Sequence, residues 1–192
     1  MTITSAEFIT GAVAPSGYPA LRVPEFAFFG RSNTGKSSLI NMMVNRKALV
    51  KTGSKPGMTR QINFFLINKA FSLVDLPGYG YARRSAAEQA AFDRMLAEYC
   101  NERSELKAIF FLIDMRREPG QVERDSVAYF LERGLEVFLV GTKADKLGSN
   151  DRSKTTAIWA DYFSVDKEKI LVTSSLKKQG RTQLLTLVSS RL

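Results

Sequence analysis

The feature that most constrains the fold is a nine-residue stretch, "GRSNTGKSS", at positions 30 to 38. It fits the pattern G-x-x-x-x-G-K-[ST] and lies between a strand-like run, "EFAFFG", and a segment with helical character. Gly30 and Gly35 allow the backbone to wrap around a phosphate group, with successive N–H groups pointing inward. The positive end of the following helix faces the same anion. This order of strand, turn and helix predicts a phosphate-binding α/β protein.

Strand-like and helix-like segments alternate along the rest of the chain. The runs "QINFFLI" and "FSLVDL" are separated by only three residues and therefore predict a hairpin. Further strands are expected in "KAIFFLID", "EVFLVGTK" and "EKILVTSS". Helices are expected from Lys36 to about Asn45, and from a capping box of Ser85 and Glu88 to about Arg103. Alternation of this kind predicts three layers, with helices on both faces of a mostly parallel six-stranded sheet that has one antiparallel edge strand.

Residues 1–23 are rich in proline and glycine and are expected to form an extended arm on a single domain of residues 24–192. The apolar side chains expected to hold the arm against the domain are Phe8, Ile9, Tyr18 and Leu21.

Composition excludes several classes of function. The chain has no histidine, which excludes histidine bases, Ser-His-Asp triads and histidine metal ligands. Its only cysteine, Cys100, cannot form an intrachain disulfide and is expected to be inert, which fits a reducing compartment. No apolar run is long enough to span a membrane, and the N-terminus does not resemble a signal peptide, so we expect a cytoplasmic protein.

A net charge of +9 and a pI of about 9.8 favour a polyanionic partner. The alternative is a basic surface that only keeps the protein in solution.

In the glycine-rich stretch, Lys36 would reach the β and γ phosphates and the Ser37 hydroxyl would bind Mg²⁺. Two further motifs follow predicted strands and supply the other contacts with the phosphates and the base. In "DLPG" at 75 to 78, Asp75 would hold Mg²⁺ through a water molecule, and Gly78 would donate its N–H to the γ phosphate. In "TKAD" at 142 to 145, Asp145 would accept hydrogen bonds from the two donors of guanine, which adenine lacks.

One feature of the base site differs from the common pattern. The guanine motif begins with Thr142 where asparagine is usual, and a threonine cannot make both amide contacts, so base affinity is expected to be modest. Lys143 would lay its alkyl stem over the base, and a backbone N–H near Ser175, in "TSS" at 173 to 175, would donate to the guanine oxygen. The basic loop of residues 46–60 contains Thr59, the natural second hydroxyl ligand of Mg²⁺.

These motifs, in this order, resemble GTPases of the translation-factor class. The stretches "PEFAFFGRSNTGKSSLIN", "KPGMTRQINFF", "DLPGYGYA" and "GTKADKL" together resemble the EngB family, also called YihA or YsxC. The resemblance implies a P-loop NTPase fold consisting of one G domain, GTP or GDP as the bound nucleotide, and Mg²⁺. It also implies a role in maturation of the large ribosomal subunit that is needed for growth and division.

On motif positions, the resemblance assigns a set of nucleotide contacts. They are Gly30, Arg31, Ser32, Asn33, Thr34, Gly35, Lys36, Ser37, Gly57, Met58, Thr59, Arg60, Gln61, Asp75, Leu76, Pro77, Gly78, Thr142, Lys143, Ala144, Asp145, Thr173, Ser174 and Ser175. The metal ligands would be Ser37 and Thr59, and the catalytic residues Lys36, Thr59 and Asn33.

Tyr79 stands where Ras-like GTPases have the glutamine that orients the attacking water. We therefore expect slow hydrolysis. Related GTPases with this change use a P-loop asparagine to hold K⁺ near the phosphates, and Asn33 stands at the matching position. The alternative is that Asn33 only stabilises the loop.

The expected partner is the large ribosomal subunit or its precursor, both rRNA and ribosomal proteins, bound by a monomer with no membrane contact. An alternative is an rRNA-binding assembly module whose GTPase activity is incidental. A nucleotide-regulated division or membrane protein is a third reading, but the sequence has no amphipathic or lipidation signal for it. Candidate RNA contacts are Arg46, Lys47, Lys51, Lys55, Arg83, Arg84, Arg116, Arg117, Lys177 and Lys178.

Overall fold

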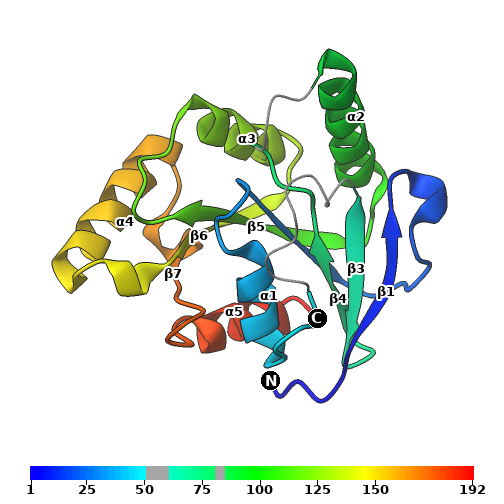
Figure 1. Cartoon of the computed structure of the whole chain (residues 1–192), viewed down its shortest axis with the longest axis horizontal. Coiled ribbons are helices and arrows are strands. Elements are labelled where there is room, and N and C mark those ends of the chain that lie inside the picture. The colour runs from blue at the N-terminus through cyan, green and yellow to red at the C-terminus, as the bar shows by residue number, and fades with distance from the viewer. Residues whose placement is uncertain (51–60, 81–84) are drawn as a thin grey trace.

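A computed structural model of the chain describes residues 1–50, 61–80 and 85–192. Within these residues, seven strands form one sheet with helices on both faces (Figure 1). The strands are β1 (Ala6–Ala12), β2 (Glu25–Gly30), β3 (Ile62–Ile67), β4 (Phe71–Asp75), β5 (Leu106–Asp114), β6 (Glu136–Thr142) and β7 (Ile170–Val172). Their order in the sheet is β1-β3-β4-β2-β5-β6-β7. β3 pairs antiparallel with both of its neighbours, and the pairs from β4 to β7 are parallel.

The sheet has one strand more than the six expected, because part of the N-terminal segment joins it. β1 pairs with β3 from Ala6 opposite Ile67 to Ala12 opposite Ile62. The antiparallel strand β3 therefore lies one place in from the edge. Phe8 and Ile9 were expected to be covered by the domain but are 53% and 36% exposed.

The strands are buried on both faces, so their side chains form two cores. β2 shows this directly, since Phe26 and Phe28 belong to one core, and Ala27 and Phe29 to the other. The first core is covered by α1 (Lys36–Val44) and α5 (Arg181–Ser189). The second is covered by α2 (Ala86–Glu102), α3 (Gln121–Glu132) and α4 (Ser149–Phe163). Three short 3₁₀ helices, η1 (Pro15–Gly17), η2 (Ala144–Lys146) and η3 (Lys167–Lys169), connect these elements.

Local sequence signals set several helix ends. The predicted capping box at the start of α2 is confirmed: Ser85 Oγ accepts from Glu88 N at 3.2 Å, and a Glu88 carboxylate oxygen accepts from Ser85 N at 3.0 Å. α1 ends one residue before Asn45, which adopts a left-handed conformation (φ 54°) and closes the helix.

The edge of the sheet opposite the glycine-rich turn contains a buried ion pair. Glu25, the fully buried first residue of β2, accepts hydrogen bonds from Tyr99 Oη at 3.0 Å and from Arg103 Nη2 at 2.6 Å. Arg103 also donates to Pro19 O at 2.7 Å. These contacts join the end of α2 to the N-terminal segment.

Two expectations about reactivity and membranes are also addressed by the structure. Cys100 is buried, and burial raises the pKa of its thiol to about 12, which makes it unreactive as predicted. Across the described ranges, no helix combines the length and apolar character that crossing a membrane requires.

Candidate functional site

The predicted motifs meet at one edge of the sheet because each follows a strand of the parallel part. β2, β4 and β6 end at Gly30, Asp75 and Thr142, and Thr173 comes directly after β7. The carboxyl ends of parallel strands face the same edge, so residues 30–37, 75–78, 142–145 and 173–175 converge there. Four predicted site residues, Gly57, Met58, Thr59 and Arg60, lie outside the described residues. Gln61 is described and lies immediately before β3. Its side-chain amide donates to Oδ1 of Asn63, the second residue of that strand, at 3.0 Å.

The turn between β2 and α1 has the backbone that its glycines predict. A Cβ at Gly30 would lie 2.7 Å from the carbonyl oxygen of Leu112, so only glycine fits there. Gly35 caps α1 with φ 101°, and Asn33 also has a positive φ, 66°. Inside the turn, the amide and hydroxyl of Thr34 both donate to the carbonyl of Arg31.

Lys36 and Asp75 form an ion pair across the site. The side chains are 11% and 4% exposed, so the pair is shielded from water on most sides. The lysine comes from the first turn of α1, and the aspartate from the last position of β4. The two predicted charged groups therefore meet next to the start of a helix, where an anion is also stabilised.

The last residue of β6 and the residue that follows it both bind the glycine-rich turn. The buried Thr142 hydroxyl donates to Thr34 O at 2.7 Å, and Lys143 Nζ donates to Asn33 O at 2.8 Å. Thr142 and Lys143 therefore both fix backbone carbonyls of the turn. Lys143 itself has a left-handed backbone (φ 57°).

Asp145 is held by Ser174, which was predicted to contact the nucleotide but not to bind Asp145. The Ser174 hydroxyl donates to Asp145 Oδ1 at 2.5 Å and accepts from Lys177 N at 3.1 Å. The hydrogen bond from Ser174 lowers the pKa of Asp145, so the carboxylate stays ionised. The amide of Ala144 donates to Thr173 O at 3.0 Å, which joins the two segments.

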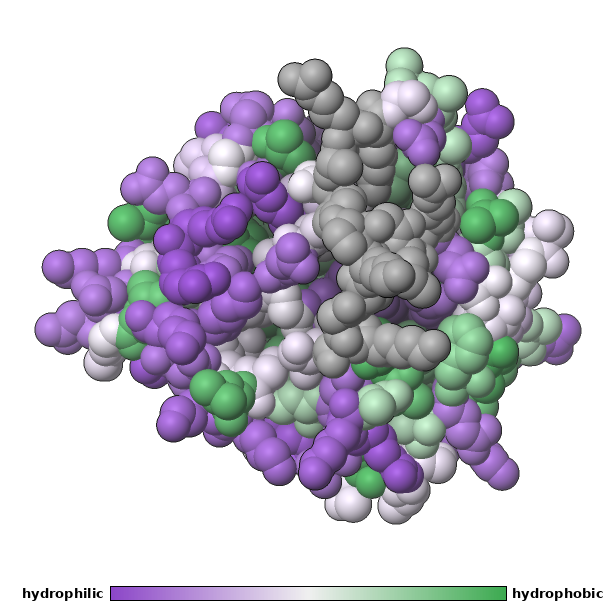
Figure 2. Space-filling model, viewed as in Figure 1, coloured by the Kyte–Doolittle hydropathy of each residue, from purple (hydrophilic) through white to green (hydrophobic). Residues whose placement is uncertain are grey.

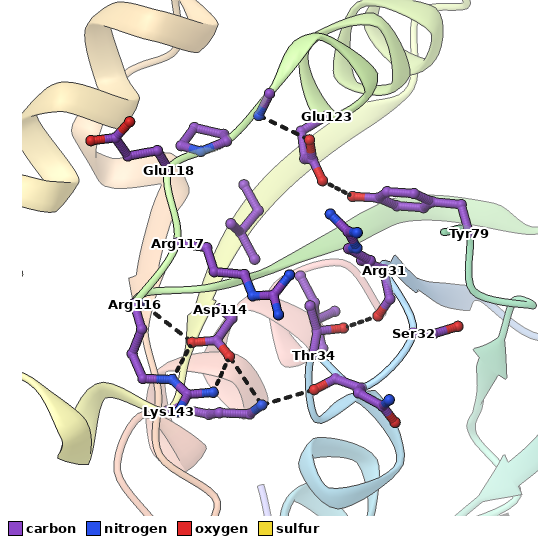
Figure 3. Close-up of a pocket in the computed structure, with 15 residues that line it drawn as sticks. Arg31, Ser32, Thr34, Tyr79, Asp114, Arg116, Arg117, Glu118, Glu123 and Lys143 are labelled. Carbon is purple, nitrogen blue, oxygen red and sulfur yellow. Dashed lines mark hydrogen bonds and ion pairs between the residues drawn. The ribbon is translucent and has the colours of Figure 1, made fainter. Parts of the chain in front are cut away.

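Sequence reasoning missed Asp114, the last residue of β5. Arg116 donates to it through Nε at 3.0 Å and Nη2 at 2.7 Å, and Lys143 Nζ lies 3.0 Å from Oδ2 (Figure 3). Burial opposes ionisation, but the hydrogen bonds from Arg116 and Lys143 hold the pKa of Asp114 well below its ordinary value. The signal in the sequence was a carboxylate at a strand end, in "FFLID", followed after Met115 by two arginines.

A cavity of about 310 Å³ lies beside the turn, between it and the start of α3. Figure 3 shows Tyr79 at one side of this cavity, pointing toward Glu123 of α3, to which its hydroxyl donates at 2.9 Å. The Tyr79 ring packs against Phe29 with centroids 5.3 Å apart, and its carbonyl accepts from Ser32 N at 2.9 Å. Burial and then the Glu123 carboxylate raise the pKa of Tyr79 well above its ordinary value. The residue in the glutamine position is therefore a packed, neutral phenol directed at α3.

Comparisons with known proteins agree with this arrangement. The family model of 50S ribosome-binding GTPases matches residues 25–143. The chain is similar to a probable GTP-binding protein EngB of Treponema denticola, with 51% identity over 100% of both chains. It is also similar to a probable GTP-binding protein EngB of Desulforapulum autotrophicum, with 46% identity over 96% of this chain and 95% of the other. The crystal structure of a probable GTP-binding protein engB has the same fold, with a TM-score of 0.71 at 19% identity over 86% of this chain and 97% of that one.

Proposed function

Because the chain belongs to the EngB family of GTP-binding proteins, a family of GTPases, we propose that it hydrolyses GTP slowly and acts as a nucleotide-dependent switch in assembly of the large ribosomal subunit. The observation that carries the proposal is the convergence of Lys36, Asp75 and Asp145 at one edge of the sheet. A cytoplasmic location and a role in growth and division belong to the same proposal.

The nucleotide would lie across the strand ends, with its phosphates in the turn and its base beside Asp145. The backbone N–H groups of Asn33 and of residues 35–37, together with the Lys36 ammonium, would bind the phosphates, while the Thr34 amide stays bound to Arg31 O within the turn. The Asp145 carboxylate, ionised and oriented by Ser174, would accept two hydrogen bonds from guanine. These two contacts would distinguish GTP from ATP.

The oxygen atoms near Lys36 suit Mg²⁺, which prefers hydroxyl and carboxylate ligands and retains several waters. Ser37 would supply its hydroxyl, and Asp75 would hold a coordinated water. Lys36 would then exchange its ion pair with Asp75 for contacts with the phosphates. Thr59 remains the proposed second hydroxyl ligand. Bound Mg²⁺ would neutralise charge that develops on the phosphate oxygens during hydrolysis.

Slow hydrolysis is proposed because Tyr79 cannot orient a water molecule from its position. Its hydroxyl is engaged by Glu123, and its ring is packed in the core. An intrinsic rate on the order of that of Ras, well below about 0.1 per second, is expected without an arginine from a partner.

The switch is tested by cosedimentation of the protein with purified large ribosomal subunits in a GTP analogue, in GDP and without nucleotide. We expect stronger binding with the GTP analogue, since the γ phosphate orders neighbouring segments in GTPases. Binding should also weaken steeply with salt. The alternative of an RNA-binding module with incidental GTPase activity predicts equal binding in all three nucleotide states. Preference for free small subunits would retain the switch but reject its proposed target.

A further inference from the structure

The positive charge of the chain is concentrated in two segments that contain no carboxylate. Residues 26–74 contain eight lysines and arginines, and residues 169–192 contain five, with no aspartate or glutamate in either range. The rest of the chain has fifteen cations and nineteen carboxylates. The net charge of +9 therefore arises entirely from these two segments.

The two carboxylate-free segments meet on one side of the molecule, because α1 and α5 cover the same face of the sheet. Arg181 Nε, at the start of α5, donates to Met42 O at 3.1 Å and to Met43 O at 3.0 Å in the last turn of α1. Lys178 Nζ lies 3.4 Å from Asn45 Oδ1, just beyond that turn. The end of α1 and the segment before α5 thus form one continuous surface.

Four cations of this surface are exposed: Arg46 and Lys47 after α1, and Lys177 and Lys178 before α5. We refer to them as the basic surface. Among the described residues, none of the four forms an ion pair with a carboxylate within 4.0 Å, unlike Lys36 and Arg191, which are paired with Asp75 and Glu136. In the lower part of the view, where Figure 1 places α5 and the end of α1, Figure 2 shows hydrophilic residues interspersed with hydrophobic ones.

We propose that the basic surface binds the phosphate backbone of folded RNA. This inference rests on the proposed function and names the part of the protein that would contact the ribosomal particle. Unpaired lysine and arginine side chains on an exposed surface bind phosphates and release condensed counterions, a contact that requires no particular base sequence. The two described segments that carry the basic surface, residues 45–50 and 176–181, contain no aromatic residue on which a base could stack. This favours contact with the backbone of a helix over a single strand.

The basic surface lies next to the base site without forming part of it. The backbone amide of Lys177, not its side chain, donates to the Ser174 hydroxyl that holds Asp145. Shortening the Lys177 side chain keeps this backbone contact and removes only a through-space charge, the last and smallest of the causes that lower the pKa of Asp145, so guanine recognition should change little. A loss of RNA binding in such a variant could not be attributed to loss of nucleotide.

The test compares the parent with a variant in which Arg46, Lys47, Lys177 and Lys178 are replaced by alanine. The matched control replaces four exposed cations elsewhere on the molecule, Arg94, Lys107, Lys154 and Lys167. Both variants lose the same charge. Binding is measured in the GTP-analogue state against salt concentration, with purified large subunits, with a 20-base-pair RNA duplex, and with vesicles containing phosphatidylglycerol.

For the basic-surface variant, we expect affinity for both RNA probes to fall at least about tenfold at 0.1 M salt. The salt slope, which is the slope of the logarithm of the binding constant against the logarithm of the salt concentration, should become shallower by about two to four units. The control variant should keep the slope of the parent, and both variants should keep its GTP affinity. Two double variants, R46A/K47A and K177A/K178A, should each show about half of the change in slope, which covers the case in which the fourfold variant fails to fold.

Equal slopes in the parent and the basic-surface variant would overturn the inference, as would a loss of vesicle binding with RNA binding unchanged. Indifference of the parent to nucleotide would instead reject the proposed switch. That result would leave the comparison of slopes valid.

Discussion

At the scale of single residues, the backbone and the side chain of Asn33 have separate roles. Its positive φ shapes the turn, and its carbonyl accepts from Lys143 Nζ. The side chain lines the cavity beside the turn and has no hydrogen-bond partner in the described part of the chain. The amide oxygen is therefore free to bind K⁺ near the phosphates. We predict that K⁺ in place of Na⁺ raises kcat for GTP, on the order of tenfold, a small part of what an arginine finger supplies.

The variant that tests this role is Asn33→Gly, since glycine adopts the same positive φ without strain and only the amide is lost. It should remove the difference between the two salts while keeping GDP affinity within about threefold. Single-turnover hydrolysis in matched K⁺ and Na⁺ buffers provides the measurement. Equal parent rates in the two buffers would contradict the prediction.

At the scale of elements, α3 is tied to the segment after β4 by Tyr79 and Glu123. Tyr79→Phe removes the hydrogen bond and keeps the ring packed on Phe29. We expect unfolding free energy to fall by about 1 kcal/mol, which lowers Tm by about 2–4 °C in a chain of this size. The value of kcat should stay within about twofold of the parent, because the phenol faces α3.

The hydrogen bond between Tyr79 and Glu123 should also make the stability of the fold depend on pH, in a direction that follows from the pKa of Tyr79. The folded-state pKa of Tyr79 lies above the ordinary tyrosine value of about 10, so the stabilisation from this contact is complete below about pH 10 and is lost as the pH rises further. Thermal melts of the parent and Tyr79→Phe from pH 7 to 11 should therefore differ most at the lower end. A large drop in kcat for Tyr79→Phe with Tm unchanged would show that the phenol acts on the reaction itself.

At the scale of the whole molecule, stability and nucleotide binding depend on opposite edges of the sheet. Glu25→Gln leaves the largely buried Arg103 without its buried carboxylate partner, which should cost roughly 3 kcal/mol and lower Tm by about 6–12 °C. GTP affinity should not change, since Glu25 begins β2 and the phosphate-binding turn follows its other end. Glu105, 3.6 Å from Arg103 and partly exposed, gives the control: Glu105→Gln should cost about 1 kcal/mol or less. A parallel loss of GTP affinity in Glu25→Gln would contradict this separation.

The sequence predicted those features that depend on neighbours along the chain. The glycine-rich turn, the capping box of Ser85 and the strand-end position of Asp75 all follow from local patterns, and the structure has each of them. β1 was missed as a strand because "AEFITGA" has no continuous apolar run and only Ala12 in it is buried, and only its pairing with β3 makes it part of the sheet.

The missed features of the site depend on contacts between distant segments. Thr142 reaches Thr34 across 108 positions, Tyr79 reaches Glu123 across 44, and Ser174 reaches Asp145 across 29. No local pattern specifies such pairs. For Asp114, the residue type was visible at a strand end, but its partner Lys143 comes from the next strand of the sheet.

The hydrogen bonds to the carbonyls of Arg31, Asn33 and Thr34 have a kinetic consequence. A free loop would have to be ordered at each encounter with a nucleotide, at a cost of about 1–2 kcal/mol of conformational entropy for every residue fixed. Here the protein fixes these three residues when it folds, so an arriving nucleotide meets a receptor that is already shaped. Association should then approach the rate set by diffusion and orientation, and the lifetime of each complex will be determined mainly by how quickly the nucleotide departs.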